Sequence, residues 1–278
     1  MIAAIESSIR TALDAAGADT QALGAIGIGT PGVADKETGV VFNASNVPGF
    51  EDKVELGPMI STALGGLPVT LENDVRAAML GEHRRGAGRR FRDVLGVFVG
   101  TGVGGGLILG GELRDGRGAA GEIGHTIVKP GGRLCSDGRR GHLESYAGRG
   151  RMEARARALA KKGHETVLFD IMQRRGRTRL SSGVFARALK VGDEMAKMLI
   201  DEAVWALGVA LASAQNLLDL EAIIIGGGLG DRLGAPFVDR VAAEMQPRLF
   251  IPERPPMVLP TELGDLSGAI GAAVVAGG

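Results

Sequence analysis

Apolar residues at the start of the chain recur every three or four positions, as they do along one face of a helix. The recurring residues are Ile2, Ile5, Ile9 and Leu13, and Gly17 follows them where such a helix would end. The spacing therefore predicts an opening helix that stops before residue 17.

Two short apolar runs come next, and each has the length of a buried strand. Residues 24–30 (GAIGIGT) form the first run, and residues 67–74 (LPVTLEND) form the second, whose polar end leads into a helical pattern over residues 75–86. Asn73 and Asp74 thus stand where a strand passes into a helix. In a parallel α/β sheet, ligands usually bind at this edge.

Residues 93–113 are predicted to form two apolar strands, separated by the segment GTGVGGG and closed by a Gly-Gly turn. Gly100, Gly102 and Gly105 match the G-x-G-x-x-G pattern, but no helical pattern follows them, so a dinucleotide-binding site is rejected. A turn whose backbone N–H groups bind phosphate, with the Thr101 hydroxyl added, fits better. A plain glycine hairpin stays open as the alternative.

The second half of the chain is mostly helical. Helical patterns cover residues 149–162 and roughly residues 184–218, and the second pattern carries an apolar stripe that we assign to the core: Met195, Met198, Leu199 and Ala203. Residues 220–245 then predict a strand and a helix joined by a triple glycine: Gly226, Gly227 and Gly228. These glycines would let the backbone approach a nucleotide, or they would allow close helix-to-strand packing. A small-residue helix ends the chain.

Composition adds that the protein is globular and rich in tight turns. The chain has 278 residues, of which 45% are hydrophobic and 46 are glycine, with only eight phenylalanines, one tyrosine and one tryptophan. A chain of this size can bury a sizeable core as one large or two ordinary domains. The glycine content indicates many strand ends and loops that bring backbone close to a ligand.

Charge and cysteine usage exclude several classes of protein. Lysine plus arginine and aspartate plus glutamate both number 32, so no net field attracts nucleic acid or an anionic membrane. The basic runs 83–92 and 174–179 are interpreted as solvated loop faces without a function. No apolar run approaches the length of a membrane span, and one cysteine fits a reducing cytoplasm. We therefore expect a cytoplasmic protein without nucleic-acid or membrane partners.

One glycine-punctuated stretch, residues 119–147, concentrates groups that bind metals and hydroxyls. It holds three acids, two of the four histidines and the only cysteine: Glu122, His125, Cys135, Asp137, His142 and Glu144. The clustering makes this stretch the main candidate for a binding site.

Seven segments resemble, in order and approximate spacing, the ROK family of bacterial sugar kinases and sugar-responsive repressors. They are GIGTPGVAD, NASNVPGF, LENDVRAAMLGE, VGTGVGGG, GEIGH, CSDGRRGHLESYAG and IIIGGG, which together span nearly the whole chain. The resemblance implies an α/β, actin-like (ribonuclease H-like) fold with two lobes. It implies a small lobe over residues 1–90, completed by a helix at 264–278, and a large lobe over residues 91–263.

The activity implied by the resemblance is glucokinase-like phosphorylation of a hexose by ATP with Mg²⁺, in a protein that forms homo-oligomers. Asp74 matches the catalytic base, and Asn73 matches an amide that binds a sugar hydroxyl. Capping of the following helix by either residue is the structural alternative, and both roles can coexist. The other implied sugar-binding residues are Gly32, Asn46, Glu122, His125 and Glu144. The implied nucleotide-binding residues are Gly100, Thr101, Gly102, Gly226, Gly227 and Gly228.

The same resemblance implies a structural zinc site with substituted ligands. The family carries G-H followed by C-x-C-G-x-x-G-C-x-E, and the four aligned positions here are His125, Cys135, Asp137 and His142. Aspartate and histidine replace two family cysteines, and both are recognised zinc ligands. A loop held by hydrogen bonds alone is the alternative.

The chain also departs from the family at its start. Family members carry a hairpin with an Asp-x-Gly-Gly-Thr phosphate loop before the helix that resembles residues 2–13, and we expect that segment to be missing and one strand edge to be uncovered. A sugar-binding protein without catalysis is therefore the alternative function. A repressor is a third possibility, although family repressors carry a helix-turn-helix domain that this sequence does not show.

Overall fold

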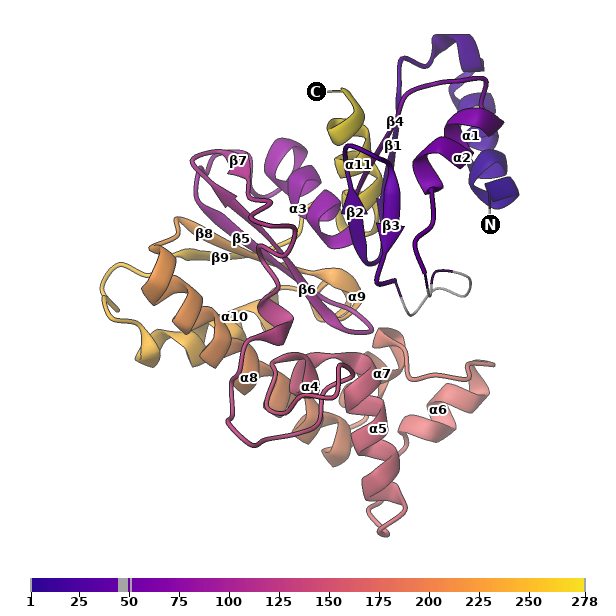
Figure 1. The fold of residues 1–278 in the computed structure, drawn as a ribbon. Coiled ribbons are helices and arrows are strands. Elements are labelled where there is room, and N and C mark those ends of the chain that lie inside the picture. Colours follow the sequence, from indigo (N-terminus) through magenta and orange to yellow (C-terminus); the bar gives the residue numbers. More distant parts are fainter. Residues whose placement is uncertain (1, 45–49, 51, 278) are drawn as a thin grey trace.

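The computed structural model describes residues 2–44, 50 and 52–277, and Figure 1 shows a small parallel sheet beside a larger mixed one. In the small sheet, β1 (Ile26–Thr30) pairs with β4 (Val69–Asn73), and Thr30 lies opposite Asn73. A separate antiparallel hairpin joins β2 (Val33–Asp35) to β3 (Val40–Phe42). Helices α1 (Ile2–Ala16) and α2 (Leu56–Ala63) share an apolar core with β1 and β4.

The larger sheet has five strands in the order β7-β6-β5-β8-β9. Their bounds are β5 (Val94–Val99), β6 (Val103–Leu109), β7 (Glu112–Leu113), β8 (Ala222–Gly226) and β9 (Met257–Pro260). Strands β5, β8 and β9 are parallel, whereas β6 and β7 run antiparallel to their neighbours. All residues of β5 and β8 are buried, as expected for central strands covered on both faces.

Helices form most of the molecule below the larger sheet in Figure 1. They are α4 (Glu144–Ala147), α5 (Arg149–Ala160), α6 (Leu168–Arg174), α7 (Ser182–Lys190), α8 (Glu194–Leu218), α9 (Gly227–Leu233) and α10 (Ala235–Met245). The central helix is α8, whose apolar face contributes Leu199, Ala203 and Leu207 to the main core. Met195 is buried in the same core and Met198 packs against it, so their assignment to the core is confirmed.

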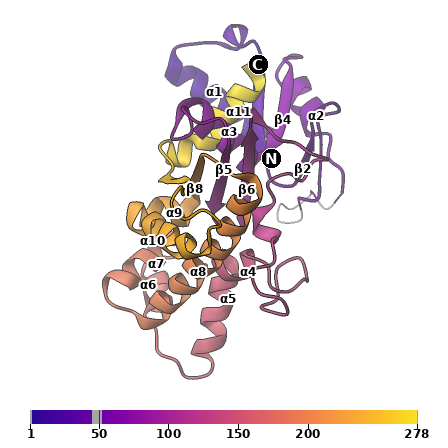
Figure 2. The same ribbon diagram turned by 90° about the vertical axis from the view of Figure 1, so that its left-hand side faces the viewer.

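Two helices lie side by side between the sheets, as Figures 1 and 2 show: α3 (Asp74–Arg85) and α11 (Ser267–Gly277). Their backbones approach so closely that a Cβ atom on Gly271 would collide with the Ala77 carbonyl group. A Cβ atom on Gly27 of β1 would likewise collide with the Ala272 carbonyl group. The small residues of the final helix therefore allow it to pack directly on a strand and a helix.

Most elements predicted from the sequence are confirmed, and one prediction needs correction. The helical pattern over 184–218 is two helices, because the chain turns at Gly192 and the Asp193 carboxylate caps the second helix at Ala196 N. Helices α2 and α6 and strands β2 and β9 were not predicted. The segment around Gly102 forms a β5–β6 hairpin without a following helix, which confirms that it is not a dinucleotide-binding motif.

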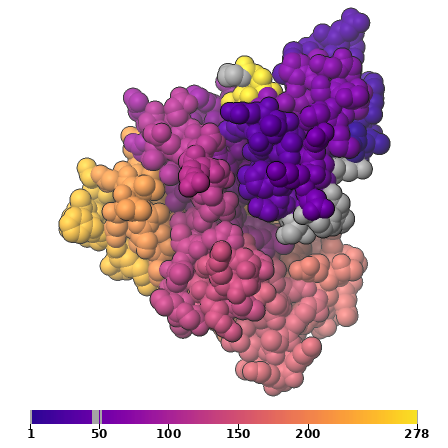
Figure 3. All heavy atoms as spheres, in the orientation of Figure 1, coloured from indigo at the N-terminus to yellow at the C-terminus, as the bar shows by residue number. Residues whose placement is uncertain are grey.

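Strand β1 pairs with β4 along one edge, and no described strand pairs with its other edge. Figure 3 shows the indigo atoms of the first part of the chain above the salmon-coloured helices. The proposed boundary between lobes at residue 90 stays a prediction. Within the described ranges, no helix has both the length and the apolar character that crossing a membrane requires.

Candidate active site

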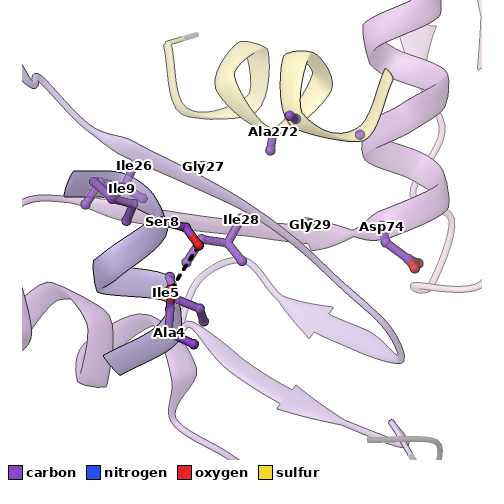
Figure 4. A pocket seen from close by; sticks show the side chains of 12 residues that line it. Ala4, Ile5, Ser8, Ile9, Ile26, Gly27, Ile28, Gly29, Asp74 and Ala272 are labelled. Carbon is purple, nitrogen blue, oxygen red and sulfur yellow. Dashed lines mark hydrogen bonds between the residues drawn. The ribbon is translucent and has the colours of Figure 1, made fainter. Parts of the chain in front are cut away.

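Asp74 lies where β4 ends and α3 begins, beside the end of β1. Gly29 of β1 makes this junction compact, because a Cβ atom there would lie 3.3 Å from the Asp74 Cα atom. Asp74 stands at one end of a groove of about 490 Å³ that is otherwise lined mainly by small and apolar residues of α1, β1 and α11 (Figure 4). Asp74 thus lies at the strand-to-helix joint where the sequence places it, and its role in catalysis stays a prediction.

The environment of Asp74 favours its neutral form. Its side chain is exposed, yet the surrounding elements crowd the carboxyl group and reduce its hydration, which raises the pKa of Asp74 above the ordinary aspartate value. A hydrogen bond from Val75 N (2.9 Å) opposes this shift in part. A carboxylate with a raised pKa is a better proton acceptor than an ordinary one.

Asn73 is engaged in holding the local fold. Its Oδ1 atom accepts hydrogen bonds from Val75 N (3.0 Å) and Arg76 N (3.1 Å), so the capping interpretation is confirmed for this residue. Its Nδ2 atom donates to Gly32 O (3.0 Å), which ties the β4–α3 junction to the turn before β2. Gly32 has φ +82°, and a Cβ atom there would lie 2.6 Å from Phe42 O, so the turn requires glycine.

Four candidate metal ligands converge in the loop between β7 and α4. One ligand atom from each of His125, Cys135, Asp137 and His142 lies within 4.8 Å of all the others. The Asp137 Oδ2 atom is 3.3 Å from His125 Nδ1 and 3.2 Å from His142 Nδ1, and the two Nδ1 atoms are 3.4 Å apart. Ligands around a tetrahedral zinc ion, at bonds of about 2.0–2.3 Å, are separated by similar distances. These four residues could therefore hold a metal.

Asp137 is suited to act as an anionic ligand. A hydrogen bond from Arg139 N (3.0 Å) is the main cause that lowers the pKa of Asp137, and the nearby histidines add to it. His125 presents Nδ1 to the metal-ligand cluster and directs Nε2 toward Glu122 Oε2, 3.9 Å away. One ring can therefore serve the metal cluster and a sugar hydroxyl through different nitrogen atoms.

Glu144 joins the loop to the β5–β6 turn. Its Oε2 atom accepts from Val103 N (3.0 Å), while Oε1 accepts from the Ser136 hydroxyl group. A Cβ atom on Gly102 would collide with this carboxylate, so a larger residue there would displace the Glu144 side chain. Glu144 is thus held at the start of β6, and the groove lined by Asp74 includes neither Glu144 nor Glu122.

The start of β6 connects the predicted base to the loop. A Cβ atom on Gly104 would lie 2.7 Å from Val75 Cγ2, whereas Gly102 faces Glu144. Residues two apart in a strand are separated by about 7 Å, so α3 and the loop contact neighbouring positions of the same strand end. The structure therefore brings the first turn of α3 and Glu144 to the same strand end. Asn46, another predicted sugar-binding residue, lies outside the described residues.

Some glycines of the two predicted nucleotide-binding loops are needed for packing, whereas others lie at the surface. A Cβ atom on Gly227 (φ +76°) would lie 2.7 Å from Val99 N, and one on Gly226 would collide with Thr261, so both are required for packing. Gly228 instead lines an open pocket. In the other loop, the Gly100 N–H donates to Gly102 O (2.9 Å), which closes the turn internally.

Sequence reasoning missed two charged groups at this site. Arg149 donates to Ser182 Oγ (2.7 Å) and Thr101 Oγ1 (3.2 Å) and so bridges two loops. Arg76, buried in α3, pairs with Glu72 (2.9 Å) and donates to the carbonyl oxygen of Arg114 (2.7 Å), which anchors the segment that leads to Glu122. The (i, i+4) spacing of Glu72 and Arg76 could have indicated this ion pair. Such spacing is expected to pair side chains within one helix, whereas Glu72 lies in a strand and Arg76 in a helix.

Comparisons with known proteins agree with this geometry. A family model described as the ROK family matches residues 1–278. The chain is 33% identical over 254 residues to a glucokinase of Thermotoga maritima, which covers 90% of this chain and 78% of that protein. It is 30% identical over 229 residues to a xylose repressor of Caldicellulosiruptor bescii, which covers 81% of this chain and 55% of that protein.

Solved structures extend the likeness to the fold. A ROK family glucokinase of Streptomyces griseus, in complex with glucose and AMPPNP, is similar with a TM-score of 0.81 and 33% identity. The similarity covers 99% of this chain and 86% of that one. The predicted actin-like fold class is confirmed.

Proposed function

Because the chain belongs to the ROK family, we propose that it is a glucokinase-like enzyme that transfers the terminal phosphoryl group of ATP to a hydroxyl group of a hexose. The family relatives named as glucokinases and the glucose and AMPPNP complex of one of them support this function. The observation in this chain that carries the proposal is the carboxyl group of Asp74. It lies exposed at the β4–α3 junction, its pKa is raised by burial, and the neighbouring Asn73 is held by a hydrogen bond to Gly32.

Asp74 acts as the general base. A sugar hydroxyl is a weak nucleophile, so its proton must move to a carboxylate as the oxygen atom attacks phosphorus. The bond between the γ-phosphorus and its bridging oxygen breaks, the electron pair leaves with ADP, and the hydroxyl proton goes to Asp74. Mg²⁺ bound with ATP supplies charge neutralisation on the phosphates.

The remaining hydroxyl groups need fixed donors and acceptors, because a buried hydroxyl without a partner is costly. We assign this role to Asn73, Glu122, Glu144 and the Nε2 atom of His125, with the backbone at Gly32 and with Asn46. Asn73 keeps its cap while it binds, because its amide group can accept and donate several hydrogen bonds.

A zinc ion bound by His125, Cys135, Asp137 and His142 would have a structural role. Four protein ligands leave no open position for substrate, as is typical of structural zinc sites. The ion would fix the loop so that His125 Nε2 and Glu144 keep their orientation. A reducing compartment such as the cytoplasm suits the free thiol of Cys135. Homo-oligomer formation stays a prediction.

The function is tested by measuring glucose-dependent ADP formation with purified wild-type protein and Asp74→Asn. Loss of the general base should lower kcat by about 10²- to 10⁴-fold, while calorimetry still detects glucose binding. The matched control is Asp239→Asn, an exposed aspartate in α10, which should retain full activity. Equal turnover of Asp74→Asn and wild type would remove Asp74 from its assigned role.

A second candidate is sugar binding without catalysis, which the likeness to a xylose repressor favours. In that case calorimetry would show sugar binding by the wild-type chain, but no ADP would form with any hexose. Wild-type turnover of glucose decides in favour of the kinase.

A further inference from the structure

Four charged side chains join the β2–β3 hairpin, the β4–α3 junction and the segment that follows β7. They are Lys36, Glu72, Arg76 and Asp115. Lys36 Nζ lies 2.9 Å from both Glu72 Oε2 and Asp115 Oδ1, and Arg76 pairs with the same two acids. Each cation therefore bridges two carboxylates that come from different sheets of the molecule.

Arg76 is the centre of this cluster. Its side chain is buried, and its Nε atom donates to Glu72 Oε1 (2.9 Å). Its Nη2 atom donates to the Asp115 carboxylate, so one guanidinium group bridges the two acids. Because the guanidinium fork is planar and always charged, it fixes the direction of each partner, which the single ammonium group of a lysine cannot do.

The same guanidinium group holds both ends of one loop. Its Nη1 atom donates to Arg114 O (2.7 Å) and more weakly to Ala120 O (3.4 Å). Residues 115–119 between these contacts are all exposed, so the loop gains little stability from packing. The shape of the loop therefore depends on the Arg76 contacts at its two ends.

This loop ends just before Glu122, a predicted sugar-binding residue. The intervening Gly121 has φ +89° and packs on β6, where a Cβ atom on it would lie 3.1 Å from Gly105 O. The two peptide groups before Glu122 are thus fixed from two sides, by Arg76 and by β6. Arg76 lies in the first turn of α3, which begins with Asp74, so its side chain links the predicted base to the predicted sugar ligand.

We propose that Arg76 is a positioning residue for the sugar, and that it holds the 114–120 loop so that Glu122 faces the hexose. The inference rests on the proposed kinase function and adds to it a residue that sets the affinity for the substrate. Asp74 keeps its place without the Arg76 side chain, because the Asn73 side chain caps α3. Loss of the bridge therefore weakens hexose binding and leaves proton transfer to Asp74 unchanged.

The experiment uses Arg76→Lys, which keeps a cation beside the buried Glu72 carboxylate but cannot hold both ends of the loop. Calorimetry with glucose and steady-state rates of ADP formation are measured on the purified full chain. The Kd and KM for glucose should rise by about tenfold or more, whereas kcat should stay within about threefold and the KM for ATP should not change. The matched control is Arg84→Lys, the same exchange at an exposed position of α3, which should leave all four constants unchanged.

A second variant, Asp115→Asn, tests the loop from its exposed side, where a substitution does not threaten folding. It removes the charge that faces Arg76 and Lys36, so it should raise the Kd for glucose by about threefold or more. Combined with Arg76→Lys it should add little, because both changes release the same loop. Its control is Glu112→Gln, which neutralises an exposed acid of β7 and should have no effect.

Thermal melting checks that each variant is folded, and Asp115→Asn decides alone if Arg76→Lys fails to fold. Unchanged glucose affinity in the folded variants, or a fall in kcat alone, overturns this inference and leaves the kinase function intact. Wild-type protein that binds glucose without forming ADP overturns the kinase function, and the Kd values then still test the role of Arg76. Wild-type protein that does neither overturns both.

Discussion

Asn73 and Asp74 are neighbours with different tasks. The Asn73 side chain accepts from two N–H groups of the first turn of α3 and donates to Gly32, so it holds the junction together. Asp74 is thereby left exposed to the groove. The sequence placed both residues at a strand-to-helix joint. It could not show which of them caps the helix and which is free to act as the general base, because either side chain can cap a helix.

The raised pKa of Asp74 predicts an acidic limb in the pH profile of the enzyme. The base must be deprotonated, so kcat/KM should fall about tenfold per pH unit as the pH drops through a pKa above the ordinary value of 3.8. Because the fold disfavours the charged form, Asp74→Asn should also raise the melting temperature slightly at pH 7, and this gain should shrink as the pH falls. Steady-state rates measured from about pH 4 to about pH 8, in steps of roughly one pH unit, would show this acidic decline in kcat/KM. A profile that stays flat down to the ordinary aspartate value of 3.8 contradicts the shift.

The four converging ligands predict one zinc ion per chain. Cys135→Ser replaces the only thiolate, so zinc retained after dialysis, measured by plasma mass spectrometry, should fall by about tenfold or more. Removal of zinc should also raise the KM for glucose, because His125 and Glu144 share the loop. His164→Ala, an exposed histidine outside the cluster, should keep its zinc. A wild-type protein purified with almost no zinc would rule out the site.

At the scale of elements, α11 depends on glycine where it crosses α3 and β1. The sequence predicted a small-residue helix packed closely on another element, but the partner could not be read from it. That contact joins segments almost two hundred residues apart, and local patterns contain no information on such pairings. The same limit explains the break at Gly192, where a side chain from Asp193 both caps α8 and accepts from Val167 N.

Two glycines within α11 provide a matched pair of substitutions. Gly271→Ala places a Cβ atom against the Ala77 carbonyl group, so α11 must move away from α3, and the free energy of unfolding should fall by about 1–3 kcal/mol. Gly268→Ala places its methyl group where no atom lies within 4 Å, so it should stabilise the helix by up to ~1 kcal/mol. Urea unfolding followed by circular dichroism measures both. Equal effects of the two substitutions would contradict the packing of α11.

For the whole molecule, the fold class was predicted from the seven motifs that resemble the family. The helices and strands were predicted from the pattern of apolar and polar residues alone. Strands β5 and β8 pair in parallel across more than a hundred residues, and no periodicity could have paired them. The candidate site was predictable where one segment holds several ligands, as in residues 119–147. The open pocket lined by Gly228 was not predictable, because its residues come from four separate parts of the chain.

One buried carboxylate joins α3 to the segment where α11 begins. Glu82, near the end of α3, has no exposed surface and accepts four hydrogen bonds. Its Oε1 atom accepts from Leu263 N (2.9 Å) and Ser267 Oγ (2.7 Å), and its Oε2 atom accepts from Ala87 N (3.0 Å) and Glu262 N (3.1 Å). The carboxylate thus connects α3 to the segment that begins α11, about 180 residues later.

Replacing this carboxylate should loosen the whole molecule. Glu82→Gln turns one acceptor atom into an N–H₂ group that faces two donors, so about two charge-assisted hydrogen bonds are lost and the free energy of unfolding should fall by roughly 3 kcal/mol. The control Glu262→Gln removes only an exposed ion pair with Arg89 (3.2 Å), and its effect should stay below about 1 kcal/mol. Urea unfolding measures both variants. Because α3 also begins with Asp74, the Glu82 variant should show a lower kcat at temperatures well below its melting point. A variant as active and as stable as wild type would show that the carboxylate does not hold α3 to the segment where α11 begins.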